Sequence, residues 1–227
     1  MAFHAGAKLS QEGGRTTDTH VSLRSPATNS TEPPAGAQTL AGATTSEDAA
    51  TPRGQARKRE ERLFLLRPLL RERILLLDGA TGTLVQRYNL TESDFRGERF
   101  RDHPCDVRGD TDLLCLTRPD VVRAVHDAYL AAGADIISTD TFTATRIAQA
   151  DYGLSDVAYE IHLEAAKIAR AAADAAEVRE PRRPRFVAGS MGPTNKTASI
   201  SPDVADPAAR SVTFVELAEA YARPPED

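Results

Sequence analysis

The sequence has little of what marks several classes of protein. Its 227 residues include no tryptophan and two cysteines, too few for the disulfide framework of a small secreted domain. No run of 18 apolar residues could cross a membrane, and the N-terminus has neither a secretory apolar core nor the acid-poor character of a transit peptide. The 33 acidic residues outnumber the 28 basic ones, so no basic surface for nucleic acid is expected. We therefore expect a cytoplasmic protein that binds neither nucleic acid nor membrane.

Aromatic residues are also missing between Phe3 and Phe64. This stretch is dominated by Ala, Thr, Ser, Gly, Pro and charged residues, and it cannot bury enough apolar surface to offset its ordering entropy. We predict a disordered low-complexity tail over residues 1–57. A leucine-rich, charged linker helix is expected over 58–73, and a folded domain over 74–227.

Three short apolar runs predict buried strands near 74–77, 135–139 and 185–190. Helical patterns separate or follow these runs, one after Thr117-Arg118-Pro119-Asp120, one over 156–176 and one from about Thr213. The first of these helices has the spacing of a capping box, and Gly133 marks its end. Strands that alternate with helices indicate an α/β fold with a parallel sheet.

The spacing of the strands indicates a ligand site. Their starts lie about 61 and about 50 residues apart, whereas a plain (β/α)8 unit takes roughly 31. The surplus follows the strands, in residues 88–116 and 142–154. Loops after the carboxyl ends of parallel strands build the active sites of barrels and of open α/β sheets. Insertions at that edge therefore favour a substrate site.

Each strand run is followed by a motif of small and polar residues: residues 78–83 (DGATGT), 139–142 (TDTF) and 189–196 (GSMGPTNK). The first favours the floor of a pocket for a polar or anionic small molecule, with a tight turn as the alternative, and it lacks the G-x-G-x-x-G spacing of a dinucleotide loop. The second fits either a polar ligand contact or the capped start of a helix. Three such loops at one sheet edge favour a binding site.

Other chemistry is not indicated. His103, His126 and His162 lack the spacing of metal ligands, and the last two fall in helical patterns as partly buried or surface residues. Cys105 and Cys115 have no partner pair at zinc spacing, and no Ser-His-Asp or Cys-His order stands out.

Four segments carry a family resemblance: ILLLDGATGT, DFRGERFRDHPCD, GADIISTDTF and GSMGPTNKTASISPDVADPAARSVTF. With them the sequence resembles the homocysteine-binding domain of cobalamin-dependent methionine synthase over about residues 70–222. Betaine- and S-methylmethionine-dependent homocysteine methyltransferases share the DG and TF elements, so they form an alternative.

This resemblance implies a (β/α)8 barrel that binds homocysteine at its carboxyl-end face and holds the thiol on zinc. It also implies methyl transfer from cobalamin, reloaded from folate, on other modules of a full-length enzyme. By motif, Asp78 and Gly79 would contact the amino or carboxylate end of homocysteine. Thr139 and Phe142 would line the same pocket, and Asn195 would lie at its rim.

The sequence departs from the family at several positions. Ser138 and Asp140 stand where Glu and Asn are usual, and Thr81 stands where Met is common. The three zinc cysteines of the family have no counterpart, and Cys105 and Cys115 cannot take their place. We therefore expect an N-terminal part of the barrel, about three of its eight βα units, that is inactive by itself. A complementing fragment of another chain and an unrelated nucleotide-binding domain are the alternatives.

Overall fold

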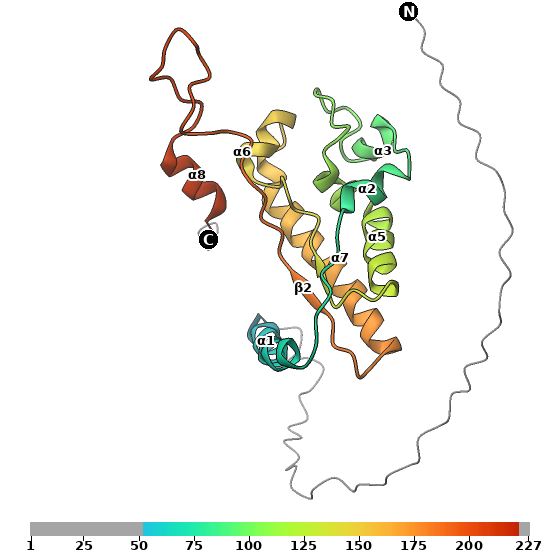
Figure 1. Ribbon diagram of the computed structural model, residues 1–227. Coiled ribbons are helices and arrows are strands. Elements are labelled where there is room, and N and C mark those ends of the chain that lie inside the picture. The colour runs from blue at the N-terminus through green and yellow to red at the C-terminus, as the bar shows by residue number, and fades with distance from the viewer. Residues whose placement is uncertain (1–51, 223–227) are drawn as a thin grey trace, which may run out of the picture. The chain divides into compact units, whose positions relative to one another are not determined.

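The computed structural model describes residues 52–222, with side chains from Lys58 onward. The predicted tail therefore lies almost wholly outside the described residues. Figure 1 shows a helix-rich chain in which two short strands run beside a long helix. The elements in chain order are α1 (Pro52–Glu72), α2 (Thr81–Gln86), α3 (Glu92–Arg96), η2 (Thr111–Leu113), α4 (Leu114–Thr117), α5 (Pro119–Ala131), β1 (Ile136–Ser138), α6 (Arg146–Gln149), η3 (Ala150–Tyr152), η4 (Ser155–Val157), α7 (Ala158–Arg179), β2 (Phe186–Ala188) and α8 (Phe214–Tyr221).

The sheet is parallel, as the sequence predicts. β1 pairs with β2 in the register Ile136↔Phe186. The predicted strand at 74–77 forms a single parallel bridge, Leu77↔Ile136, so the expectation of a full first strand was wrong. Two hydrogen bonds make this bridge, from Ile136 N to Leu76 O (3.0 Å) and from Asp78 N to Ile136 O (2.9 Å). The first apolar segment, β1 and β2 thus lie side by side in chain order.

Helix α5 begins at Pro119 and ends at a left-handed glycine. The predicted capping box is wrong, because Arg118 is the N-cap residue and binds Asp120 through its guanidinium. The predicted stop is confirmed: Gly133 has φ +102°, and Ala134 N and Gly133 N close the helix on carbonyls of its last turn. A glycine adopts this conformation without the Cβ clash that another residue would suffer.

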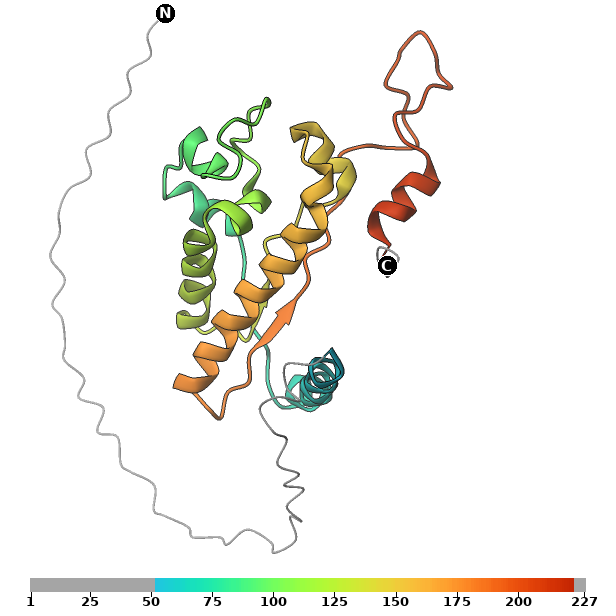
Figure 2. The ribbon, with the colours of Figure 1, turned by 180° about the vertical axis from the view of Figure 1, so that it is seen from behind.

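Helix α7 packs one face of the sheet. It is alanine-rich, which favours the helix and lets its backbone approach the strands closely. Ala169, Ala172 and Ala173 are fully buried beside Ile137 of β1 and Leu130 of α5. Figure 2, from behind, shows α7 and α5 on one side of the strands. Residues of α5 and α7 therefore bury one face of β1.

The first insertion, residues 88–116, forms core rather than an open loop. Phe95, Phe100, Val107 and Leu113 are buried in one cluster with residues of α5 and α7. A capping box closes the start of α3, where Thr91 and Asp94 bond reciprocally. Through Asp112 and Cys115, the insertion also bonds the segment that follows β1.

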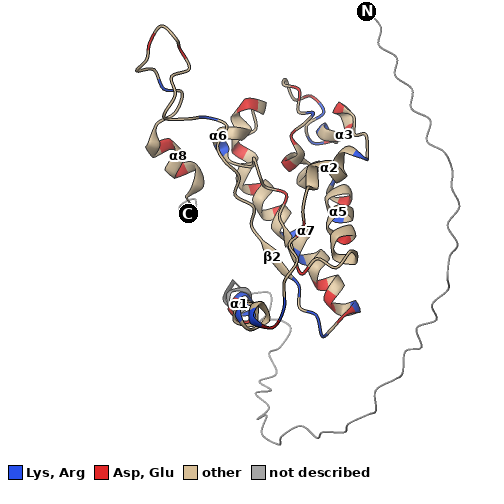
Figure 3. Cartoon of the chain, viewed as in Figure 1, with Lys and Arg blue, Asp and Glu red and all other residues tan. Residues whose placement is uncertain are grey.

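Charged residues gather at the amino ends of the strands, where Figure 3 shows Lys and Arg positions in blue on α1 and on the segment that enters β2. The fully buried Asp135 accepts two hydrogen bonds of 2.8 Å from Arg73, one of 3.0 Å from Arg183 and one of 3.0 Å from Leu76 N. Burial raises the pKa of Asp135, but these hydrogen bonds outweigh it and hold the pKa well below its usual range. This network joins three chain segments.

Helix α1 is tied to the same end of the fold. Its Arg62 bonds both Glu177 and Asp174 of α7, and Glu177 in turn accepts from Arg185 N at 2.7 Å. The helix begins six residues before the predicted linker helix and runs through Pro68. No helix within residues 52–222 is long and apolar enough to cross a membrane.

Candidate functional site

The carboxyl end of the first apolar segment carries Asp78. Both oxygens of its carboxylate accept hydrogen bonds from Ser138, one from the backbone N–H and one from the hydroxyl, each at 2.9 Å. Asp78 is half-buried, and Gly79 beside it is exposed. A Cβ at Gly79 would lie 3.7 Å from the Tyr129 hydroxyl, which is ordinary contact. Asp78 is therefore a fixed carboxylate at a loop that a ligand can reach.

The second and third loops are joined by hydroxyl contacts. Thr139 Oγ1 accepts from Ser190 N at 2.9 Å and lies 2.8 Å from Thr141 Oγ1. The Thr141 hydroxyl donates to Ser190 O at 2.8 Å. Thr139 and Thr141 are both buried, so these bonds lock the loop after β1 to the loop after β2. The expectation that these two loops meet at one edge agrees with these contacts.

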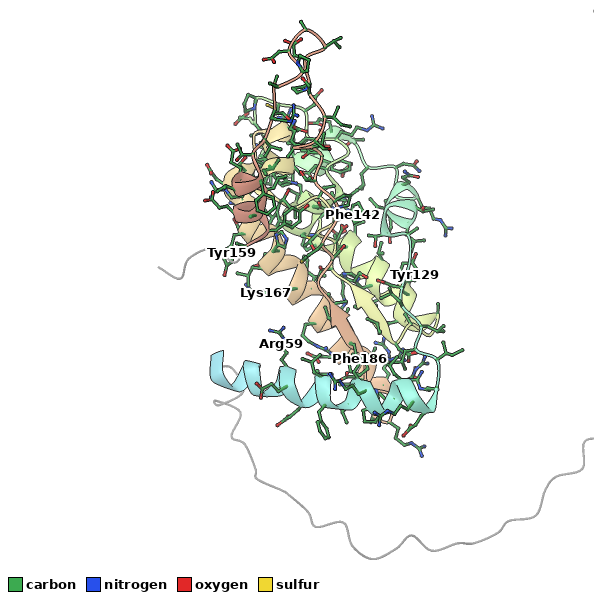
Figure 4. All side chains as sticks on the ribbon, turned by 60° about the vertical axis from the view of Figure 1, so that its left-hand side comes forward. Arg59, Tyr129, Phe142, Tyr159, Lys167 and Phe186 are labelled. Atoms are coloured by element: carbon green, nitrogen blue, oxygen red, sulfur yellow. The ribbon has the colours of Figure 1, made fainter. Side chains whose placement is uncertain are left out.

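Phe142 and Gly192 meet where these loops cross. A Cβ at Gly192 would lie 2.0 Å from Phe142 O and 2.9 Å from its ring, so no larger residue fits without movement. The Phe142 side chain is 56% exposed, which makes it available to an apolar part of a ligand. Figure 4 shows Phe142 farther from α1 than Phe186, which lies beside that helix.

Asn195 forms its side-chain hydrogen bond with Asp151 and with none of the other four predicted site residues. Its amide donates to Asp151 Oδ2 at 2.6 Å, and Lys196 Nζ binds the other oxygen of Asp151 at 2.9 Å. Asn195 is exposed. It fastens the third loop to the segment before α7, and its assignment to the rim of a pocket stays a prediction.

A cleft of about 1080 Å³ opens beside the joined loops. Thr139, Thr141 and residues 189–192 line one side, and residues of α6, η4, α7 and α8 line the other. The Tyr221 hydroxyl of α8 donates to Gly192 O at 2.8 Å and so holds α8 at this edge. Of the five predicted site residues, Thr139 alone lines the cleft, while Asp78, Gly79, Phe142 and Asn195 do not.

Three buried aspartates lie behind the loops. Burial and the charges of Asp112 and Asp110 raise the pKa of Asp140 to about 8. Burial raises the pKa of Asp110 to about 6, against a hydrogen bond from the Gln149 amide at 3.0 Å. Burial also raises the pKa of Asp112, which accepts from both the backbone and the hydroxyl of Thr143. Asp140 therefore holds a proton near neutral pH, because burial and its two acidic neighbours disfavour its charged form.

Neither cysteine is placed for metal binding. Cys115 is buried and donates to Asp140 O at 3.6 Å, and burial raises its pKa, so it is a thiol rather than a thiolate. Cys105 is half-buried in the first insertion. Within residues 52–222, no three His, Cys, Asp or Glu side chains are arranged to hold a metal ion. The zinc that the resemblance implies does not fit these residues.

Sequence reasoning missed several members of this region. The helical pattern suggested that His126 is partly buried or at the surface, but it is fully buried. Burial lowers its pKa, so the imidazole under the first loop is neutral near pH 7. Asp110 and Asp112 were not singled out. Their close spacing was a signal, but their electrostatic interaction with Asp140 depends on how the insertion packs.

These observations define an α/β protein with a carboxylate and joined polar loops at the carboxyl ends of parallel strands. The chain belongs to the homocysteine S-methyltransferase family, whose sequence model matches residues 75–224. Two solved structures of the homocysteine methyltransferase MmuM from Escherichia coli are similar. The metallated form is 27% identical and the oxidized form 29% identical, each with a TM-score of 0.45 over 56% of this chain. The matches cover 41% and 40% of the MmuM chains, so this chain spans about two fifths of their length.

Proposed function

We propose that residues 74–222 form the first three βα units of a (β/α)8 barrel that binds homocysteine for methylation to methionine. Membership of the homocysteine S-methyltransferase family supports this function. The parallel order of the first apolar segment, β1 and β2 supports the barrel, because consecutive strands of such a barrel are neighbours. The observation that carries the proposal is the meeting of the strand-end loops through Asp78, Ser138, Thr139 and Ser190.

The proposed binding mode assigns separate parts of the site to the ends of homocysteine. Asp78 accepts hydrogen bonds from the ammonium group, because its oxygens each keep a free lone pair beside the bonds from Ser138. The backbone at Gly79 approaches the amino-acid end closely, since no side chain blocks it. Thr139, which lines the cleft, and the exposed ring of Phe142, which lies outside it, are assigned to the amino-acid ligand, and Asn195 to the rim of its site.

The methyl donor is proposed to be that of the methionine synthase type. The GPTNKTASISPDV run of the third loop favours the cobalamin-dependent branch over betaine- or S-methylmethionine-dependent enzymes. In this proposal the cobalamin and folate modules are partners of the chain. Zinc activation of the thiol is not assigned to this chain, because its described residues offer no set of ligands for the metal. The chain alone is therefore expected to bind substrate without methylating it.

Binding of L-homocysteine to the 227-residue chain tests the proposal. Calorimetry or ligand-observed NMR should detect binding, and Asp78→Asn should weaken it about tenfold, since hydrogen bonds to charged groups are strong. Asp102→Asn, at an exposed aspartate, is the matched control and should change nothing. Absence of homocysteine binding would overturn the proposal. Stoichiometric zinc with methyl transfer by this chain would overturn the expectation of inactivity.

A role as one half of a complemented barrel is a second candidate. Ile74, Leu76 and Leu77 at the outer edge of the first segment are 53–85% exposed, an apolar edge that a further strand could cover. Co-purification with a second chain that carries zinc cysteines would favour this candidate. Restored zinc binding and methyl transfer in the mixture would establish it.

A further inference from the structure

Ser138 holds the Asp78 carboxylate from two directions. Its backbone N–H donates to Oδ2 and its hydroxyl donates to Oδ1, each at 2.9 Å. Two bonds from one residue fix both the position and the rotation of a carboxylate, whereas one bond fixes position alone. Because the backbone bond does not depend on the side chain, the hydroxyl is the group that sets the rotation.

The held carboxylate has no cation beside it among the described residues. Asp135 at the other end of the strands is paired with Arg73 and Arg183, but Asp78 takes part in no ion pair within residues 52–222. The nearby His126 is buried and neutral, so it supplies no positive charge. Asp78 is half-buried, which strengthens its attraction for a cation without closing it off.

We propose that Ser138 is a positioning residue that turns the Asp78 carboxylate toward the ammonium group of the bound amino acid. This inference rests on the proposed function and goes beyond it by naming the group that gives the site its preference for an α-amino ligand. Ser138 has a small neutral side chain, which leaves Asp78 as the single acid of the pair. Loss of the Ser138 hydroxyl leaves the charge of Asp78 in place but lets its carboxylate rotate.

The test compares two ligands that differ in the amine alone: L-homocysteine and 4-mercaptobutanoic acid. Titrated into the 227-residue chain, Ser138→Ala should weaken L-homocysteine about tenfold and leave 4-mercaptobutanoic acid within about twofold. Ser138→Thr keeps a hydroxyl and should restore most of the loss. In an Asp78→Asn background, Ser138→Ala should have no further effect, because the two residues act together. Ser93→Ala, at an exposed serine of α3, is the control.

Each outcome decides between the two proposals. If the unmodified chain binds no homocysteine, both fail. If it binds homocysteine and Asp78→Asn abolishes the preference for the amine, but Ser138→Ala does not, the proposed function stands and the role of Ser138 is overturned. Equal weakening of both ligands, or a Ser138→Thr variant as weak as Ser138→Ala, would also overturn it by indicating a purely structural role. Thermal unfolding of each variant shows whether the fold is kept.

Discussion

At the amino ends of the parallel strands Asp135 accepts hydrogen bonds from Arg73 and Arg183, whereas at the carboxyl ends Asp78 accepts from Ser138. Both aspartates join the same chain segments, the first apolar run and β1. The arginines at the amino end hold the pKa of Asp135 low, and their ion pairs with Asp135 compensate its negative charge. At the carboxyl end the charge of Asp78 is held but not neutralised, which is the condition for binding a cationic group.

The same contrast appears in the buried acids. Asp140 lies at the carboxyl end and has no arginine partner within the described residues, and burial raises its pKa to about 8. Aspartates thus form ion pairs that stabilise the fold at the amino ends of the strands, whereas at the carboxyl ends Asp78 and Asp140 have no ion-pair partner among the described residues. Sites that bind ligands commonly keep such perturbed groups, whereas structural ends satisfy them.

Removing the charge of the amino-end acid should have the largest effect. Asp135→Asn leaves Arg73 and Arg183 without their carboxylate and should cost about 3 kcal/mol of unfolding free energy in urea. The low pKa of Asp135 contributes stability above its unfolded value near 4, and that stability is lost as the pH falls. The difference in unfolding free energy between wild type and Asp135→Asn should therefore shrink below about pH 4.

The matched control is Asp106→Asn. Asp106 lies 3.6 Å from Arg96, but its side chain is 94% exposed, so the change should be small at every pH. Equal losses in the two variants would show that the amino-end network is no more important than a surface pair.

Filling the crossing of the two loops should have the next largest effect. Gly192→Ala places a Cβ 2.0 Å from Phe142 O, so the loops must separate at a cost of about 2 kcal/mol. Gly82→Ala in α2 is the control, because nothing lies within 4 Å of its Cβ position, and it should be neutral or slightly stabilising. A Gly192→Ala protein as stable as Gly82→Ala would contradict the close contact at the carboxyl end.

Neutralising Asp140 should have a smaller effect that depends on pH. The pKa of Asp140 is raised in the folded protein. Asp140 therefore costs the wild type no stability below the unfolded pKa near 4, and the wild type loses stability as the pH rises from there toward 8. Asp140→Asn should remove this loss and be more stable than wild type at pH 8, with the gain vanishing near pH 4. Urea unfolding across this range measures it, and a gain independent of pH would contradict the assignment.

The sequence carries the local part of this architecture. Gly133 ends α5 as predicted because the signal is a glycine one residue past an apolar stripe, and Thr213 caps α8 for an equally local reason. The run at 74–77 was predicted to be a full strand, but it forms one bridge. How many bridges form depends on the segment that pairs with it, here at Ile136, and not on the run itself. The predicted capping box between Thr117 and Asp120 does not form, because the Arg118 side chain donates hydrogen bonds to Asp120.

The candidate site divides in the same way. The DG, TDTF and GSMG loops could be placed at one edge because each directly follows an apolar run. The pairing of Ser138 with Asp78 joins residues 60 apart, and that of Arg73 with Asp135 joins residues 62 apart. No spacing rule within one segment predicts such partners. The raised pKa values of Asp110 and Asp140 follow from burial in the folded chain, which the sequence pattern of the insertion does not predict.

A titration of the ¹⁵N-labelled chain with L-homocysteine, followed by amide chemical shifts, tests most directly that the carboxyl ends are the binding end. We expect shifts at Gly79, Ser138 and residues 139–142, and no shifts at Arg73, Asp135 or Arg185. The Asp78→Asn protein should show much smaller shifts at the same ligand concentration. Shifts confined to the amino-end network, or none at saturating homocysteine, would contradict the account.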